Sequence, residues 1–230
     1  MPLVSVITPA SRSAKVLAQL FRDFKNQTFA DFEHILVYDG KVPADVQVLA
    51  DQYKKLYNLR FYSIEKDMGN VHWGSGRACP GNKPRNYGLS MAKGKYVIYA
   101  DDDNRYRGDY LEAHVMNIRE NSITVTQVAC SESRIYKNGK PDRIVVIPEI
   151  GLPTFPIICH VDTANFMLPI KWALENPWIP EPENDFRMIK RVVEKYKPTI
   201  FIKNGIHADL DGLVTKGLRD WVTVPPFLRG

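Results

Sequence analysis

The sequence has few cysteines and no long apolar run. Its three cysteines, Cys79, Cys130 and Cys159, are widely spaced and include no Cys-x-x-Cys pair. This pattern argues against a disulfide framework or a cysteine zinc site and favours reduced thiols in a cytosolic type of compartment. No stretch reaches the roughly 18 apolar residues of a membrane-spanning helix, and the N-terminus leads into a strand-like segment rather than a signal peptide. We therefore expect a cytoplasmic protein without a transmembrane segment, which could also lie at the surface of a membrane.

A block of basic residues of the kind that binds nucleic acids is also absent, although the net charge is +5. The lysines and arginines are dispersed, so we expect no nucleic-acid partner; the basic excess suits an anionic small molecule or a membrane surface. With 230 residues, 44% of them hydrophobic, the composition is typical of one globular core. We expect a single domain, residues 1–230, made of a first half (1–110), a second half (111–210) and a C-terminal tail (211–230).

In the first half, short apolar runs alternate with amphipathic segments. The expected strands are Leu3–Thr8, which Pro9 should end, His34–Tyr38, Leu59–Ile64 and Lys95–Ala100. The expected helices run from Ser11 or Ser13 to about Asn26, from Val42 to Tyr57 and from Lys83 to Ala92. Residues 68–84, rich in Gly, Pro and Asn, suggest a loop over a site. This alternation predicts an α/β fold whose mostly parallel, Rossmann-like sheet is flanked by helices.

The second half is less regular. Short strands are expected at 123–129, 134–136, 143–147 and 165–168, with a hairpin turn at Asn138-Gly139. A helix is expected at 182–195 and a last strand at 199–203, followed by a tail of little periodicity. These elements predict a smaller mixed or antiparallel C-terminal part.

Three consecutive carboxylates, Asp101, Asp102 and Asp103, follow directly on a strand-like run. Adjacent negative charges repel one another, and a divalent cation is one way to compensate them. Carboxylate oxygens suit Mg²⁺ or Mn²⁺, which proteins usually hold with one or two carboxylates plus substrate phosphates. A solvated acidic turn is the alternative interpretation.

Polar and turn-forming residues also follow the other predicted parallel strands. Thr8-Pro9-Ala10 ends the first strand and Asp39-Gly40 ends the second. Ligands of such sheets bind at the carboxyl ends of the strands. We therefore expect these residues and the acidic triplet to lie on one rim of the sheet.

Four motifs in order resemble a known family. They are Val4-Ser5-Val6-Ile7-Thr8-Pro9, Val37-Tyr38-Asp39-Gly40, the segment from Gly81 to Leu89, and the segment from Ala92 to Asp103. This order resembles the family 2 glycosyltransferases with the GT-A fold, closely over residues 3–110 and weakly over 160–210. The resemblance implies a nucleotide-sugar-binding half (1–110) and an acceptor-binding half (111–210). It also implies metal-dependent, inverting transfer from a nucleotide sugar, with a UDP-sugar favoured, to a glycan, lipid-linked or protein-linked hydroxyl.

The resemblance also assigns the nucleotide site. Asp101 would face ribose or sugar, Asp103 would bind Mn²⁺ or Mg²⁺, and Asp102 would lie between them, although three in a row leave the register open by one residue. Asp39, followed by Gly40, would accept a hydrogen bond from the base, commonly the uracil N–H. The remaining nucleotide-sugar-binding candidates are Thr8, Pro9, Ala10 and Arg12 around the nucleoside, Arg85 for a phosphate or a site carboxylate, and Lys83 for the diphosphate. Plain turns, connections and surface charges are the structural alternatives for these residues.

The resemblance further assigns the acceptor side. Asp185 would be the general base, with Glu183 as its rival, because Asn184 stands where the family often has the first acid of a pair. Helix-start acids that complement the helix dipole are the alternative. His207 would complete the metal or diphosphate site. Independently of the resemblance, Trp178 lies in a Pro-rich segment close to Asp185, and we expect it to be an exposed aromatic that stacks on the acceptor sugar. Their alternatives are a surface histidine and a packing residue.

Two rival functions remain open. A nucleotidyltransferase that makes nucleotide sugars would use a similar sheet, but it requires a Gly-rich loop after the first strand, where this chain has Thr8-Pro9-Ala10-Ser11-Arg12. A non-catalytic module that binds a nucleotide or a sugar would be expected to lack an intact acidic triplet and a base.

Overall fold

The computed structural model describes residues 1–66, 81–131, 144–148, 156, 161–181 and 183–209. Most of the expected site loop (68–84), the expected strand 134–136, the Asn138-Gly139 turn, the C-terminal tail, Cys79 and Cys159 therefore lie outside the described residues. Cys130 is buried. No helix in the described ranges combines the length and the apolar character needed to cross a bilayer.

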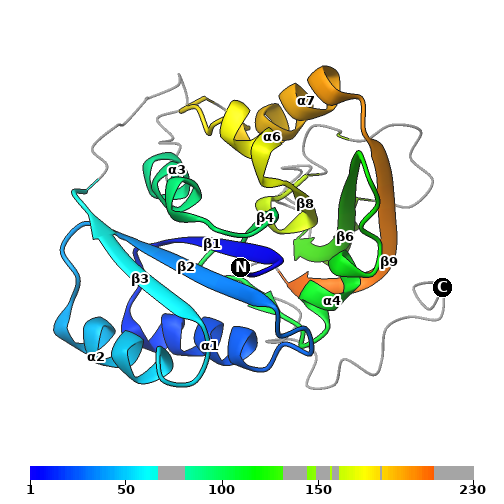
Figure 1. Cartoon of the computed structure of the whole chain (residues 1–230). Coiled ribbons are helices and arrows are strands. Elements are labelled where there is room, and N and C mark those ends of the chain that lie inside the picture. The colour runs from blue at the N-terminus through cyan, green and yellow to red at the C-terminus, as the bar shows by residue number, and fades with distance from the viewer. Residues whose placement is uncertain (67–80, 132–143, 149–155, 157–160, 182, 210–230) are drawn as a thin grey trace.

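The N-terminal half forms a parallel sheet with helices on both faces (Figure 1). The strands are β1 (Val4–Ala10), β2 (Phe32–Asp39), β3 (Leu59–Ile64) and β4 (Tyr96–Tyr99), in the order β3-β2-β1-β4. The helices α1 (Ala14–Lys25) and α2 (Ala44–Tyr53) cover one face, and α3 (Asn82–Met91) covers the other. The alternation of apolar side chains along β1 explains both layers, because Val4 and Val6 pack in the α1/α2 core whereas Ile7 packs in the core of α3.

Helix α3 lies unusually close to the sheet. A Cβ atom added to Gly88 would meet Cγ2 of Ile7 at 2.6 Å, which is shorter than any ordinary contact. Glycine at this position therefore allows α3 to approach β1 and brings the start of the helix to the carboxyl rim of the sheet.

The C-terminal half continues the same sheet with mixed pairing. Its strands are β5 (Arg105–Tyr106), β6 (Ser122–Ser131), β7 (Ile144–Ile147), β8 (Phe166–Pro169) and β9 (Thr199–Asp209). Its helices are α4 (Tyr110–Val115), the single 3₁₀ turn η1 (Thr163–Asn165), α6 (Ile170–Glu175) and α7 (Asn184–Tyr196). The order continues β4-β8-β6-β9-β5, with β7 paired to β6. Strand β5 follows β4 closely in sequence, yet it forms the edge of the sheet opposite to β3, with β8, β6 and β9 between β4 and β5. The sheet is curled, as Figure 1 shows.

The predicted fold class is confirmed, with corrections to individual elements. Strand β1 continues through Pro9 instead of ending there. Its pairing with β4 stops at Ile7, so the missing N–H of Pro9 falls beyond that ladder. Helix α2 ends at Tyr53 instead of Tyr57, and β9 runs to Asp209 instead of residue 203. Elements β5, α4 and α6 were not expected.

Candidate active site

A pocket opens at the carboxyl ends of β1, β2 and β4, beside the start of α3. The sequence-predicted residues that line it are Pro9, Ala10, Arg12, Asp39, Arg85, Asp101, Asp102 and Asp103. Ser11, Gly81 and Pro84 complete the lining. The structure thus brings together residues that lie up to about ninety positions apart in sequence, because the carboxyl ends of neighbouring parallel strands share one rim.

Asp102 is the buried member of the acidic triplet. Its Oδ2 accepts hydrogen bonds from the backbone N–H groups of Ser11 (2.8 Å) and Arg12 (3.1 Å). Burial raises the pKa of Asp102 to about 6; the N–H of Ser11 opposes this shift, and the charges of Asp103 and Asp101 add to it. Asp102 therefore fixes the loop between β1 and α1 against the end of β4.

Asp101 is held from two sides. Its Oδ1 accepts a hydrogen bond from Nη2 of Arg85 at 2.6 Å, and its Oδ2 accepts one from the hydroxyl of Thr163 at 3.0 Å. The Arg85 side chain is only 8% exposed, so this ion pair is shielded from solvent. Asp101 thereby joins the start of α3 to η1 across the pocket floor.

Asp103 is the most accessible of the three carboxylates. Its side chain is 30% exposed, and its Oδ2 accepts a hydrogen bond from Nη2 of Arg12 at 2.5 Å. Nε of Arg12 also lies 3.6 Å from Oδ1 of Asp102. The single positive charge of Arg12 thus lies close to two of the three carboxylates, and its own side chain is 53% exposed.

The backbone at Gly81 shapes the position of Arg85. Gly81 precedes α3 with φ at +88°, a conformation that glycine tolerates and other residues rarely adopt. An added Cβ there would lie 2.8 Å from Nη1 of Arg85. The turn at Gly81 thus leaves room for the guanidinium group that holds Asp101.

Asp185 lies in the first turn of α7 and is electrostatically linked to the pocket. Its Oδ1 accepts a hydrogen bond from the N–H of Phe186 at 2.8 Å. Burial raises the pKa of Asp185; Arg85 lowers it and Asp101 raises it to a smaller extent. Arg85 and Asp101 line the pocket, whereas Asp185 itself is not among the lining residues.

Glu183 is placed differently from Asp185. It precedes α7 with φ at +52°, its side chain is exposed, and its nearest ion-pair partner is Arg187 at 3.9 Å. Of the described residues that line the pocket, Glu183 is not one.

Trp178 is buried, in contrast to the exposed aromatic expected from sequence. Its ring is 2% exposed, packs edge-on against Tyr99 and lies under the guanidinium of Arg85, 4.8 Å from the ring centroid. Its backbone N–H and C=O both bond to the side chain of Asn86. Trp178 thus supports Arg85 from below instead of offering an open stacking face.

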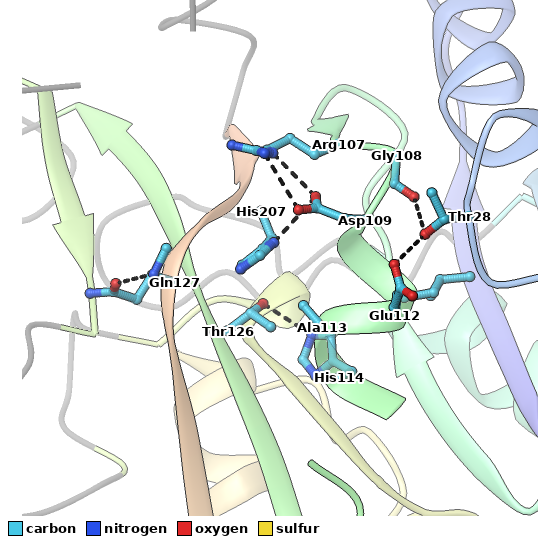
Figure 2. Close-up of polar contacts among 12 residues, drawn as sticks. Thr28, Arg107, Gly108, Asp109, Glu112, Ala113, His114, Thr126, Gln127 and His207 are labelled. Carbon is cyan, nitrogen blue, oxygen red and sulfur yellow. Dashed lines mark hydrogen bonds and ion pairs between the residues drawn. The ribbon is translucent and has the colours of Figure 1, made fainter. Parts of the chain in front are cut away.

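His207 lies within β9 and not after the last strand. Its Nδ1 is 3.3 Å from Oδ1 of Asp109, which also pairs with Arg107 (Figure 2). The imidazole of His207, next to this carboxyl group, lowers the pKa of Asp109 to about 2. His207 is not among the residues that line the pocket, and its side chain faces Asp109 instead.

Three further candidates lie beside the pocket lining instead of within it. The hydroxyl of Thr8 bonds to Nε2 of the buried His34 at 2.9 Å. Gly40 adopts φ at +102° and donates its N–H to Ile64. The ammonium of Lys83 donates to the carbonyl of Glu65 at 3.3 Å.

The pocket carboxylates suit a metal that is shared with a phosphate ligand. Among the described residues, no group of three or more His, Cys, Asp or Glu side chains is arranged to hold a metal ion. Asp103 offers an accessible hard oxygen at the pocket mouth. Mg²⁺ and Mn²⁺ commonly bind one or two carboxylates and take further oxygens from substrate phosphates, so this donor set fits that mode of binding.

Sequence reasoning missed two supports of the site, Ser11 and Thr163. Ser11 contributes through its backbone, which no side-chain pattern could indicate. Thr163 lies in η1, whose start is marked by Asp162: the Asp162 side chain accepts from the N–H of Ala164, and Asn165 bonds back to the N–H of Asp162. An Asp followed three residues later by Asn is a capping signal that could have located this turn.

Comparisons with known proteins agree with this geometry. The family model described as glycosyl transferase family 2 matches residues 5–196. A cholesterol galactosyltransferase from Borreliella burgdorferi is 31% identical over 133 residues, which cover 58% of this chain and 33% of that protein. This chain therefore spans about a third of the length of that relative.

Solved structures show the same fold. TarS 1-349 of S. aureus in complex with UDP-GlcNAc gives a TM-score of 0.66 at 19% identity, covering 91% of this chain and 58% of that one. Glucosyl-3-phosphoglycerate synthase from Mycobacterium tuberculosis, in complex with Mn²⁺, UDP and glucosyl-3-phosphoglycerate, gives 0.60 at 12% identity, covering 89% and 71%. Since the family model also covers most of the sequence, this chain belongs to glycosyl transferase family 2 and has the GT-A fold.

Proposed function

We propose that this chain transfers a sugar from a nucleoside diphosphate donor, with a UDP-sugar favoured, to an acceptor hydroxyl by a single inverting displacement. The observation that carries the proposal is one pocket that joins Asp39, two arginines and the acidic triplet. The binding of UDP-GlcNAc by TarS and of UDP with Mn²⁺ by the mycobacterial synthase supports this choice of donor and metal.

The pocket residues divide the donor between them. Asp39, at the end of β2, would accept a hydrogen bond from the N–H of a uracil base. Arg12 and Arg85 would pair with the diphosphate, since a guanidinium binds phosphate oxygens in a forked, charge-assisted geometry. Asp103 would hold a divalent metal, which neutralises the charge that develops on the leaving diphosphate. Asp101, held by Arg85 and Thr163, would face the ribose or the sugar.

Asp185 would take the proton from the acceptor hydroxyl. Burial raises its pKa, which makes the carboxylate a stronger base than an exposed aspartate, and the nearby charge of Arg85 opposes this shift. The acceptor would be a hydroxyl of a glycan, a lipid-linked sugar or a protein-linked sugar. The buried position of Trp178 leaves the aromatic contacts of that acceptor to other residues.

A thermal-shift panel tests the donor. A ligand at 100 times its Kd adds about 2.7 kcal/mol to the unfolding free energy. UDP and dTDP with Mn²⁺ should stabilise the protein more than ADP, because the N–H of uracil or thymine can donate a hydrogen bond to Asp39. Asp39→Asn should reduce the difference between UDP and ADP, whereas Asp31→Asn, an exposed change just before β2, should not. Equal shifts with all nucleotides would contradict the role of Asp39. UDP binding without any transfer or hydrolysis of UDP-sugars would indicate a non-catalytic module.

A further inference from the structure

The side chain of Arg12 forms an ion pair with Asp103, the carboxylate that the metal would bind. Its Nη2 lies 2.5 Å from Oδ2 of Asp103, and its Nε lies 3.6 Å from Oδ1 of Asp102. A divalent ion on Asp103 would therefore meet a positive guanidinium group at bonding distance from the same carboxylate. The two cations cannot both keep their full interaction with this group, because like charges at such a distance repel.

The backbone and the side chain of Arg12 have separate roles. The backbone N–H groups of Ser11 and Arg12 donate to Oδ2 of Asp102 and hold the loop in place. The side chain is half exposed, and within the described part of the chain its ion pairs are with Asp102 and Asp103. The guanidinium group can therefore turn away from Asp103 while the loop keeps its hydrogen bonds to Asp102.

A bound diphosphate gives Arg12 an alternative partner. Phosphate oxygens accept two parallel hydrogen bonds from a guanidinium group and carry more negative charge than one carboxylate. The metal, in turn, finds no cluster of three ligating side chains in the described residues and needs the oxygens of the phosphates. When the diphosphate binds, Arg12 would thus leave Asp103 for the phosphate oxygens, and the metal would take its place on Asp103.

We propose that Arg12 is a built-in competitor of the metal, which it excludes from Asp103 until a nucleoside diphosphate draws the guanidinium group away. Binding of metal and binding of nucleotide are then positively coupled, and by linkage each raises the affinity for the other by the same factor. This inference rests on the proposed function, because it requires a diphosphate in the pocket.

The experiment measures the binding of Mn²⁺ and UDP to the full chain by calorimetry and by the EPR signal of free Mn²⁺. It compares wild type with Arg12→Gln, Asp103→Asn, the double variant and Arg22→Gln. Arg22 is an exposed arginine in the last turn of α1 whose side chain bonds to Gln19, so it matches the change of charge outside the pocket. Melting temperatures and circular dichroism of each variant check that it is folded.

Wild type should bind Mn²⁺ weakly alone and at least about 5-fold more tightly with UDP, in the range of typical coupling. Arg12→Gln should bind Mn²⁺ alone roughly 2–5-fold more tightly, as expected from removal of a partly exposed ion pair, should bind UDP more weakly, and should show a smaller coupling factor. The double variant should lose the gain in Mn²⁺ affinity, since the gain acts through Asp103. Arg22→Gln should behave as wild type.

The outcomes separate the two proposals. Absence of UDP binding by folded wild type, with or without Mn²⁺, would overturn the proposed function and this inference with it. If wild type binds UDP but Arg12→Gln and wild type have equal affinities for Mn²⁺ alone, including no detectable binding by either, the competition is wrong while the proposed function stands. A gain in Mn²⁺ affinity that persists in the double variant would also overturn the role assigned to Asp103.

Discussion

Three consecutive aspartates of identical chemistry meet three different environments. Asp101 is clamped by Arg85 and Thr163, Asp102 is buried on two backbone N–H groups, and Asp103 is accessible and paired with Arg12. Asp101 and Asp103, with side chains 23% and 30% exposed against 9% for Asp102, are therefore the two carboxylates that a ligand in the pocket can reach. At the level of single residues, environment decides which carboxylate does chemistry and which holds the loop.

The same distinction applies to the two candidate bases, Asp185 and Glu183. Asp185→Asn keeps the shape of the side chain and removes its ability to accept a proton. We expect the transfer rate to fall by about 10²–10⁴-fold, the usual contribution of a general base, while UDP affinity changes little. Steady-state kinetics with a transferable acceptor and calorimetry with UDP measure the two effects.

Glu183→Gln is the matched control, because it makes the same kind of change two residues away on an exposed side chain. It should leave the rate within a few-fold of wild type. If Glu183→Gln abolishes transfer and Asp185→Asn does not, the base is misassigned; if neither matters, base-assisted inversion at this segment is wrong.

At the scale of elements, the start of α3 places a charge in the pocket. Gly81 is the residue that precedes α3, and its backbone has a positive φ. Because glycine has no Cβ, space remains there for the guanidinium group of Arg85. Gly81→Ala should therefore lower the unfolding free energy by about 1 kcal/mol or more, the usual penalty of a left-handed conformation for alanine. It should also weaken UDP binding, because the added methyl group displaces Arg85 from Asp101.

Gly205→Ala provides the control for this change of backbone. Gly205 has φ at +112° and lies in β9, where an added Cβ would approach His207 and not a residue of the pocket lining. This variant should lose stability but keep UDP affinity in calorimetry. Equal losses of UDP affinity in both variants would show that general destabilisation, and not Arg85, explains the effect of Gly81→Ala.

At the scale of the whole molecule, Asp102 ties global stability to pH. Burial raises its pKa from 3.8 to about 6, so the folded protein holds this proton more tightly than the unfolded chain. The contribution of Asp102 to stability is therefore present below about pH 4 and is lost as pH rises through 6. Asp102→Asn should be stabilised relative to wild type by on the order of 2–3 kcal/mol above pH 7, and this gain should vanish near pH 4. Urea unfolding at several pH values measures this difference.

Asp109 provides the comparison of opposite sign. His207 lies beside Asp109 (Figure 2) and lowers the pKa of this carboxyl group to about 2. The contribution of Asp109 to stability is therefore present above about pH 4 and is lost as pH falls toward 2. Asp109→Asn should therefore destabilise the protein at neutral pH and have less effect in acid.

For Asp102, the contradicting outcome is a difference in stability between wild type and Asp102→Asn that does not depend on pH. It would show that Asp102 ionises normally in the folded protein.

Much of the fold could be predicted from local patterns. The strand at Leu59–Ile64 and the starts of α3 and α7 agree with expectation to within about two residues, because apolar periodicity and Gly or Pro punctuation are local properties. The pairing of β6 with β7 also follows the expected antiparallel C-terminal part. Pro9 misled the prediction, since whether a proline ends a strand depends on where the neighbouring strand stops.

The sequence by itself determined the alternation of strands and helices, and with it the rim on which Asp39 and the acidic triplet meet. Only the tertiary structure decided which arginines form ion pairs with the triplet. Arg12 reaches Asp103 from the loop after β1, and Arg85 reaches Asp101 from the first turn of α3. It also decided that Trp178 is buried and that His207 faces Asp109. Partner choice and burial depend on which surfaces are pressed together in space, and a linear pattern of residue types does not contain that information.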